Sequence, residues 1–100
     1  MKKERKLPRR LTARVRPDDV YPLFSRHKVK LKFDVLEGSE DGPPNVLIEG
    51  DKISLEYLAK LIMAQAEDED CGVQLMTGQR VIADDSPMGV YIHRLPCMNK

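Results

Sequence analysis

The sequence contains no tryptophan, and its other aromatic residues are three tyrosines and two phenylalanines. Proteins that bind single-stranded nucleic acid often stack the bases on exposed aromatic rings, so this scarcity argues against such a platform. Long apolar runs are also missing, and no segment approaches the roughly twenty residues that cross a bilayer. No apolar segment follows Lys2 and Lys3, as it would in a signal peptide. We therefore expect a cytoplasmic protein without a membrane partner.

Cysteine and histidine are scarce as well. Cys71 and Cys97 are too few for a disulfide framework, and in a reducing compartment both are expected to be free thiols. His93 and Cys97 are four residues apart, and with Cys71 and His27 they would complete a tetrahedral zinc set. Structural zinc sites usually bring their ligands in close pairs such as C-x2-C, whereas Cys71 stands alone. We expect no metal and no cofactor.

The same scarcity bears on catalysis. Nucleophilic catalysis needs a base beside the nucleophile and a third group that orients the base. The sequence has no local cysteine–histidine signature. Its paired carboxylates fall in predicted turns, whereas acid–base catalysis needs carboxylates inside a pocket. We therefore predict that the chain is not an enzyme, and we assign no catalytic residues.

What the sequence does contain is an uneven distribution of charge. Its 100 residues suit one domain, and 41% are hydrophobic and 33% charged. Residues 1–16 hold eight basic residues and one acidic residue, a balance of +7, whereas residues 17–100 hold nine basic and fifteen acidic ones, a balance of −6. We predict a flexible basic arm over residues 1–10 and a single α+β domain over residues 11–97.

This charge distribution allows three interpretations: nucleic-acid contact through the arm, a cationic partner for the acidic body, or a solvated tail with no partner. In the first, the arm and a lysine-rich strand would form a positive stripe for phosphates, although no helix-turn-helix or RNP pattern is present. The candidate nucleic-acid-binding residues are Lys2, Lys3, Arg5, Lys6, Arg9, Arg10, Lys28, Lys30 and Lys32.

Alternation of apolar and polar residues predicts the first strands. LTARVR, residues 11–16, predicts a strand, and PDDVYPLF predicts one helical turn that opens at Pro17 and is limited by Pro22. HKVKLKFDVLE is the clearest strand, because it has one apolar and one polar face. The apolar face holds Val29, Leu31, Phe33 and Val35, and the polar face holds Lys28, Lys30, Lys32 and Asp34.

The middle of the chain predicts a hairpin followed by one long helix. The Gly/Pro-rich loop at residues 38–44 joins the clearest strand to NVLIEG, so these strands are expected to be antiparallel neighbours. Asp51 is the expected N-cap of a helix from Lys52 to about Glu67. Its predicted buried face holds Leu55, Leu58, Ala59, Ile62 and Ala66, widened by Leu61 and opposed by Lys52, Glu56 and Lys60.

The last third of the chain predicts more strands. VQLM and RVIA flank TGQ and predict a tight hairpin, and VYIHRL predicts a final strand that Pro96 ends. The complete order predicts an α+β fold, in which an antiparallel β-sheet of about five or six strands carries one long helix, about residues 52–67, on one face.

The Gly50–Asp51 turn before the helix is a possible anion site, because a helix N-terminus presents free N–H groups. Phosphate-binding loops use several glycines, however, and here a single glycine is flanked by Glu49 and Asp51, which would repel an anion. We interpret Asp51 as a helix cap.

Acidic residues gather at the other end of the helix. Negative charge at a helix C-terminus costs a few tenths of a kcal/mol to about 1 kcal/mol, so this run favours a surface for a partner. A solvated acidic loop explains it equally well. The candidate partner-binding residues are Glu67, Asp68, Glu69, Asp70, Asp84 and Asp85.

Three segments together resemble a known family. They are a strand ending in Ile48 to Asp51, a helix pattern from Leu55 to Ile62, and an acidic-Ser turn leading into a hydrophobic strand, from Asp84 to Leu95. Over residues 45–95 the chain resembles the immunity protein 32 family, small bacterial proteins encoded beside polymorphic toxins. The resemblance implies a protein that binds and neutralises a cognate toxin in the cytoplasm, without catalytic residues. An acidic patch would steer it toward a basic toxin domain such as a nuclease.

Overall fold

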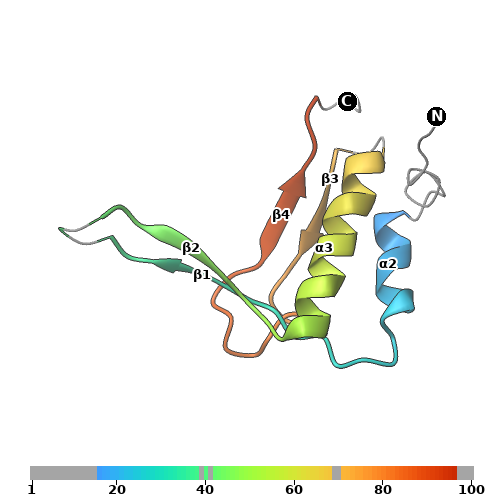
Figure 1. The fold of residues 1–100 in the computed structure, drawn as a ribbon, viewed down its shortest axis with the longest axis horizontal. Helices are drawn as coiled ribbons and strands as arrows, with labels where there is room; N and C mark the ends of the chain where they lie inside the picture. Colours follow the sequence, from blue (N-terminus) through green and yellow to red (C-terminus); the bar gives the residue numbers. More distant parts are fainter. Residues whose placement is uncertain (1–15, 39, 41, 69–70, 97–100) are drawn as a thin grey trace, which may run out of the picture.

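A computed structural model of the chain describes residues 16–38, 40, 42–68 and 71–96. The elements in chain order are α2 (Pro17–Leu23), β1 (Lys32–Leu36), β2 (Asn45–Glu49), α3 (Lys52–Glu67), β3 (Gly72–Leu75) and β4 (Val90–His93). The α+β class is confirmed (Figure 1). The predicted basic arm at residues 1–10 lies outside the described residues, as do residues 11–15 of the strand predicted at residues 11–16; Arg16 is the N-cap of α2.

The strands are fewer than predicted and form two sheets in place of one. In the described residues β1 pairs with β2 and β3 pairs with β4, and both pairs are antiparallel. The hairpin expected around the loop at residues 38–44 is confirmed, with a register that runs from Lys32↔Glu49 to Leu36↔Asn45.

The predicted hairpin between VQLM and RVIA is wrong. The partner of β3 is β4, and the TGQ segment makes a turn in which Gly78 has a φ of 93°, a left-handed conformation that favours glycine. Val81 and Ile82 are consecutive and both buried, whereas a strand with one wet face would bury only one of them. Ile82 instead forms an isolated bridge with Leu31, at the start of β1.

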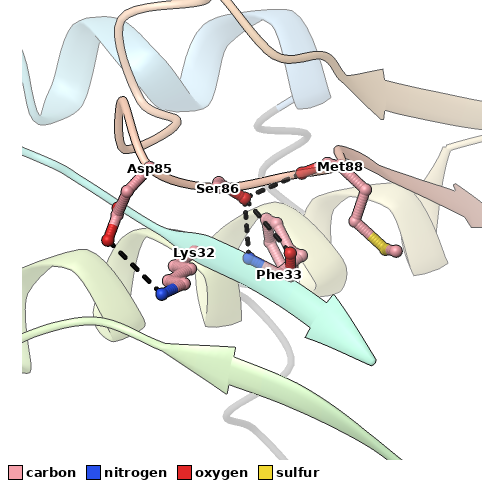
Figure 2. Close-up of polar contacts among 5 residues, drawn as sticks. All are labelled: Lys32, Phe33, Asp85, Ser86 and Met88. Carbon is pink, nitrogen blue, oxygen red and sulfur yellow. Dashed lines mark hydrogen bonds and ion pairs between the residues drawn. The ribbon is translucent and has the colours of Figure 1, made fainter. Parts of the chain in front are cut away.

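One serine connects the two sheets (Figure 2). Ser86 lies before β4, and its buried Oγ accepts a hydrogen bond from the Phe33 N–H of β1 at 2.9 Å. The hydroxyl has one proton, for which the Met88 carbonyl at 2.8 Å and the Phe33 carbonyl at 3.2 Å are acceptors. Beside it, Lys32 Nζ lies 3.3 Å from Asp85 Oδ2. A side chain therefore satisfies the backbone groups of Phe33.

The core lies where α2, α3 and the two sheets meet. Leu31 and Phe33 bring β1 into it, at 0% and 2% exposure, and Val20 brings α2. The short helix predicted from Pro17 is confirmed, with Pro22 inside its last turn. α2 and its C-cap pack against α3 through edge-to-face rings, with centroid distances of 6.3 Å for Tyr21–Tyr57 and 5.6 Å for Phe24–Tyr57.

The bounds predicted for α3 are confirmed, but most of its predicted buried face is wrong. The buried residues are Ser54, Tyr57, Leu58, Leu61, Ala64 and Gln65. Leu58 and Leu61 were expected there, whereas Leu55, Ala59, Ile62 and Ala66 are exposed. The helix carries two apolar stripes, and hydrophobicity alone does not choose between them. The rings of α2 make the choice, because they pack on the flank that carries Tyr57.

The turn before α3 acts as a cap, as predicted. Asp51 Oδ1 accepts a hydrogen bond from the Ser54 N–H at 2.9 Å. Gly50 is closely packed: a Cβ there would lie 3.0 Å from Leu31 Cδ2 and 3.2 Å from the Lys30 carbonyl. The glycine is explained by this close approach between the turn and the chain entering β1, without any ligand.

Cys71 is disulfide-bonded, so the expectation of a free thiol at this position is wrong. Cys97, the only other cysteine of the sequence, lies outside the described residues. The expectation assumed a reducing compartment, in which disulfides are rare. Neither described helix has the length and apolar character needed to cross a membrane.

Replacing Ser86 with alanine should lower the free energy of unfolding by about 1–3 kcal/mol, because the Phe33 N–H and the Met88 carbonyl lose a buried partner. Urea titration followed by circular dichroism measures the change. Ser25→Ala is the matched control, since Ser25 is exposed, and it should stay within about 0.5 kcal/mol of the wild type. A wild-type midpoint for Ser86→Ala would contradict the connecting role.

The cap predicts an acid-dependent loss of stability. Hydrogen bonds from the side chain and backbone of Ser54 hold the pKa of Asp51 below its usual value. A lowered pKa in the folded state contributes stability above the unfolded pKa, which is about 3.9, and this stability is lost as pH falls through the folded value. Asp51→Asn keeps a neutral cap and has no proton to bind there. The stability difference between wild type and Asp51→Asn should therefore shift against the wild type between about pH 6 and about pH 3, and a constant difference would contradict this.

Candidate functional site

The β1–β2 hairpin projects away from the helices and from β3 and β4 (Figure 1). We call residues 32–49 the projecting hairpin. Phe33 and Val35 lie on one face of β1, because they are two residues apart, and their partners Ile48 and Val46 lie on the same face. Phe33 is buried at the root of the hairpin. The other three are exposed, Val46 by 69% and Ile48 by 49%.

The opposite face of the projecting hairpin is also partly apolar. Leu36 is 47% exposed there, and Leu47, which pairs with Asp34, is half-buried. A two-stranded hairpin is marginally stable in water unless it packs against something else. Scattered exposed apolar residues are normal on a protein surface, but contiguous apolar patches mark sites of interaction. The projecting hairpin therefore has the character of a binding element.

Acidic residues surround this apolar surface. From residue 33 to residue 51 the sequence contains six acidic residues and no basic one. Among them Glu37 and Glu40 are exposed in the loop that joins the strands, and Glu49 is exposed on β2. The projecting hairpin thus combines an apolar face with a negative rim, a pattern that suits a partner with a positive surface.

The exposed residues of α3 form a second apolar stripe. We call Leu55, Ala59, Ile62 and Ala66 the outer stripe of α3. Ala59 and Ala66 follow Tyr57 and Ala64 by two residues, which turns them about 200° around the helix axis. The outer stripe therefore lies on the flank of α3 away from α2, and the projecting hairpin leaves the body on that same side (Figure 1).

The predicted acidic partner-binding residues do not form one patch. Asp84 and Asp85 lie at the root of the projecting hairpin, where Asp85 meets Lys32. In the strand register Lys32 lies opposite Glu49, which comes just before α3. Glu67 and Asp68 lie at the far end of this sixteen-residue helix. A helix of that length spans about 24 Å. Glu69 and Asp70 lie outside the described residues.

The predicted nucleic-acid-binding residues are also divided. Lys28 and Lys30 line a cleft of about 410 Å³, which we call the basic cleft. Lys32 does not line the cleft and is paired with Asp85. The residues that line the cleft are Tyr21, Ser25, Arg26, His27, Lys28, Val29, Lys30 and Arg80. The remaining predicted residues, Lys2, Lys3, Arg5, Lys6, Arg9 and Arg10, lie outside the described residues.

Sequence reasoning missed two residues of the basic cleft. Arg26 was missed although it begins the run RHKVK, whose density of basic residues was a usable signal. Arg80 was assigned to a hairpin that does not form. Nothing in the sequence around it indicates that its side chain lines the same cleft as the loop after α2.

The histidines and carboxylates of the described ranges form no metal site: no group of three or more His, Cys, Asp and Glu is placed to hold an ion. The ring of His93 stacks on Tyr91 on an exposed face of β4, at a centroid distance of 5.6 Å. Burial raises the pKa of Tyr57, because the charged phenolate is disfavoured away from water. The candidate features of the described residues are therefore exposed apolar side chains and a basic cleft.

Comparisons of the chain with family models, with curated proteins and with solved structures found no match in any of the three.

Proposed function

We propose that this chain is a non-enzymatic binding protein that docks on a partner protein through its projecting hairpin. One observation carries the proposal: the chain holds Val35, Val46 and Ile48 in water on an element that extends beyond its own core. Exposure of these side chains is unfavourable, by about 25 cal/mol for each Å² of apolar surface that a partner could cover. Burial against a partner would recover this free energy.

The shape of the surface supports a protein partner over a small ligand. Val35, Val46 and Ile48 line none of the three described pockets and lie together on one face of a two-stranded ribbon. In the described residues β2 pairs only with β1, so its outer edge offers backbone N–H and C=O groups to an added strand. A protein can use both the edge and the apolar face.

Charge supports a basic partner. The acidic rim of the projecting hairpin would attract a positive surface over long range and accelerate association. A toxin domain that acts on nucleic acid has such a surface. The resemblance to the immunity protein 32 family, over residues 45–95 and thus β2, α3, β3 and β4, would imply the same class of function. We therefore propose that the chain binds and neutralises a cognate bacterial toxin.

A partner centred on the projecting hairpin would contact only some of the predicted acidic residues. Asp84 and Asp85 adjoin the root of the projecting hairpin and belong to its negative surface. Glu67 and Asp68 lie at the other end of α3 and would be remote from a partner centred on the hairpin. The two groups of residues can therefore be tested against each other.

Reversing the apolar character of the projecting hairpin should abolish protection. In cells that express a cognate toxin domain, wild-type protein should restore growth and Val46→Lys/Ile48→Lys should not. The purified variant should bind the toxin at least about thirtyfold more weakly, which corresponds to a loss of about 2 kcal/mol. Leu23→Lys is the matched control, because Leu23 is exposed on α2, on the other side of α3. Wild-type affinity of the double variant would overturn the docking surface.

Reversing the charge of the hairpin loop should slow association. At low ionic strength Glu37→Lys/Glu40→Lys should reduce the association rate constant about tenfold or more, and its salt dependence should become flatter. Stopped-flow fluorescence with the toxin domain measures both. Glu67→Lys, at the far end of α3, should leave the rate near that of the wild type. If Glu67→Lys slowed association more than the loop variant, the acidic contact would lie at the helix end.

A further inference from the structure

The basic cleft is formed by Tyr21 of α2, by the segment at residues 25–30 that follows α2, and by Arg80. The described residues include nine lysines and arginines and twelve aspartates and glutamates. Four of the nine basic residues line this cleft, Arg26, Lys28, Lys30 and Arg80, and none of the twelve acidic residues does. This local excess of positive charge stands in a body that is otherwise acidic.

The cations of the cleft have no acidic partner among the described residues. Elsewhere Lys32 pairs with Asp85, and Lys52 pairs with Glu56 at 3.2 Å. Within the described ranges no carboxylate lies within ion-pair distance of the four basic side chains of the cleft. Like charges at close range repel one another, and a bound anion would remove that cost.

Arg80 lines both the basic cleft and a second pocket beside it. Its Nη1 donates a hydrogen bond to the Tyr21 hydroxyl at 3.0 Å. Both side chains also line a neighbouring pocket of about 300 Å³ between α2, α3 and β3. We call this the apolar pocket. The Arg80–Tyr21 pair therefore stands at the boundary between a cationic space and an apolar one.

The apolar pocket has the lining that a flat ring requires. Tyr57, Leu61, Val73, Leu75 and Val81 supply aromatic and aliphatic wall. The amides of Gln74 and Gln79 supply donors and acceptors, and Asp18 is the one carboxylate of the lining. Sites for small molecules usually combine such an apolar lining with a few polar groups, in volumes of about 300–1,000 Å³.

We propose that the basic cleft and the apolar pocket form one site for a phosphorylated compound that carries a planar ring. The phosphate lies in the cleft, where the guanidinium groups of Arg26 and Arg80 match its oxygens and the lysines add charge. The ring lies in the apolar pocket, and Arg80 adjoins both parts. This chemistry occurs in a free nucleotide and in a nucleotide unit of a single strand. The site does not depend on the projecting hairpin.

The test titrates ¹⁵N-labelled full-length protein with AMP, adenosine, inorganic phosphate and a short oligothymidylate, followed by amide chemical shifts. AMP should bind more tightly than either of its parts, with shifts at Lys28 and Arg80 in the cleft and at Val73 and Val81 in the pocket. Arg80→Gln should weaken binding about tenfold or more, as expected for a lost charged hydrogen bond. Lys60→Gln is the control, because Lys60 is exposed on α3 outside both linings.

The outcomes separate the two sources and the two halves of the site. Tighter binding of the oligothymidylate than of AMP, with shifts at the same residues, assigns the nucleotide to a nucleic-acid strand. AMP binding no tighter than phosphate overturns the ring-binding half. Unchanged affinity in Arg80→Gln, or in Lys28→Gln/Lys30→Gln should the first variant unfold, overturns the site as a whole.

Discussion

The backbone of residues 30–33 must be satisfied inside the core, and the rest of the structure depends on how this is done. The Lys30 N–H donates to Ser54 Oγ at 2.8 Å, and the Phe33 N–H donates to Ser86 Oγ at 2.9 Å. Between them the Leu31 N–H and carbonyl bond to the backbone of Val81 and Ala83. Buried peptide groups without partners would be costly, so two serine hydroxyls do here what a neighbouring strand does in a continuous sheet. They place α3 and the approach to β4 against one strand.

This arrangement explains why local features were predictable. The limits of α3 follow from Asp51 and a local cap, and the β1–β2 pairing follows from alternation and a Gly/Pro loop. Each depends on residues close together in the sequence. The partner of β3 and the burial of Val81 and Ile82 depend on contacts across about fifty residues, such as that of Ser86 with Phe33. A buried serine has no signature in a sequence that also contains exposed ones.

The candidate sites, too, were predictable only where they depend on residues close together in the sequence. A negative charge excess was visible in the sequence, but its division between the hairpin root and the far end of α3 was not, because sequence does not give the direction of a helix relative to a loop. The outer stripe of α3 was visible as hydrophobicity and was assigned to the core. The choice between two stripes was made by Tyr57 and the rings of α2, which lie more than thirty positions away in the sequence.

Among the described residues the outer edge of β2 is open, which matters where many identical chains are present. A strand edge that lacks a partner and carries apolar side chains is a template on which other copies can assemble into extended sheets. The carboxylates of the projecting hairpin repel those of a second hairpin, and Pro43 and Pro44 interrupt the donor groups just before β2. The same charges that attract a basic surface thus discourage self-association while the chain is alone.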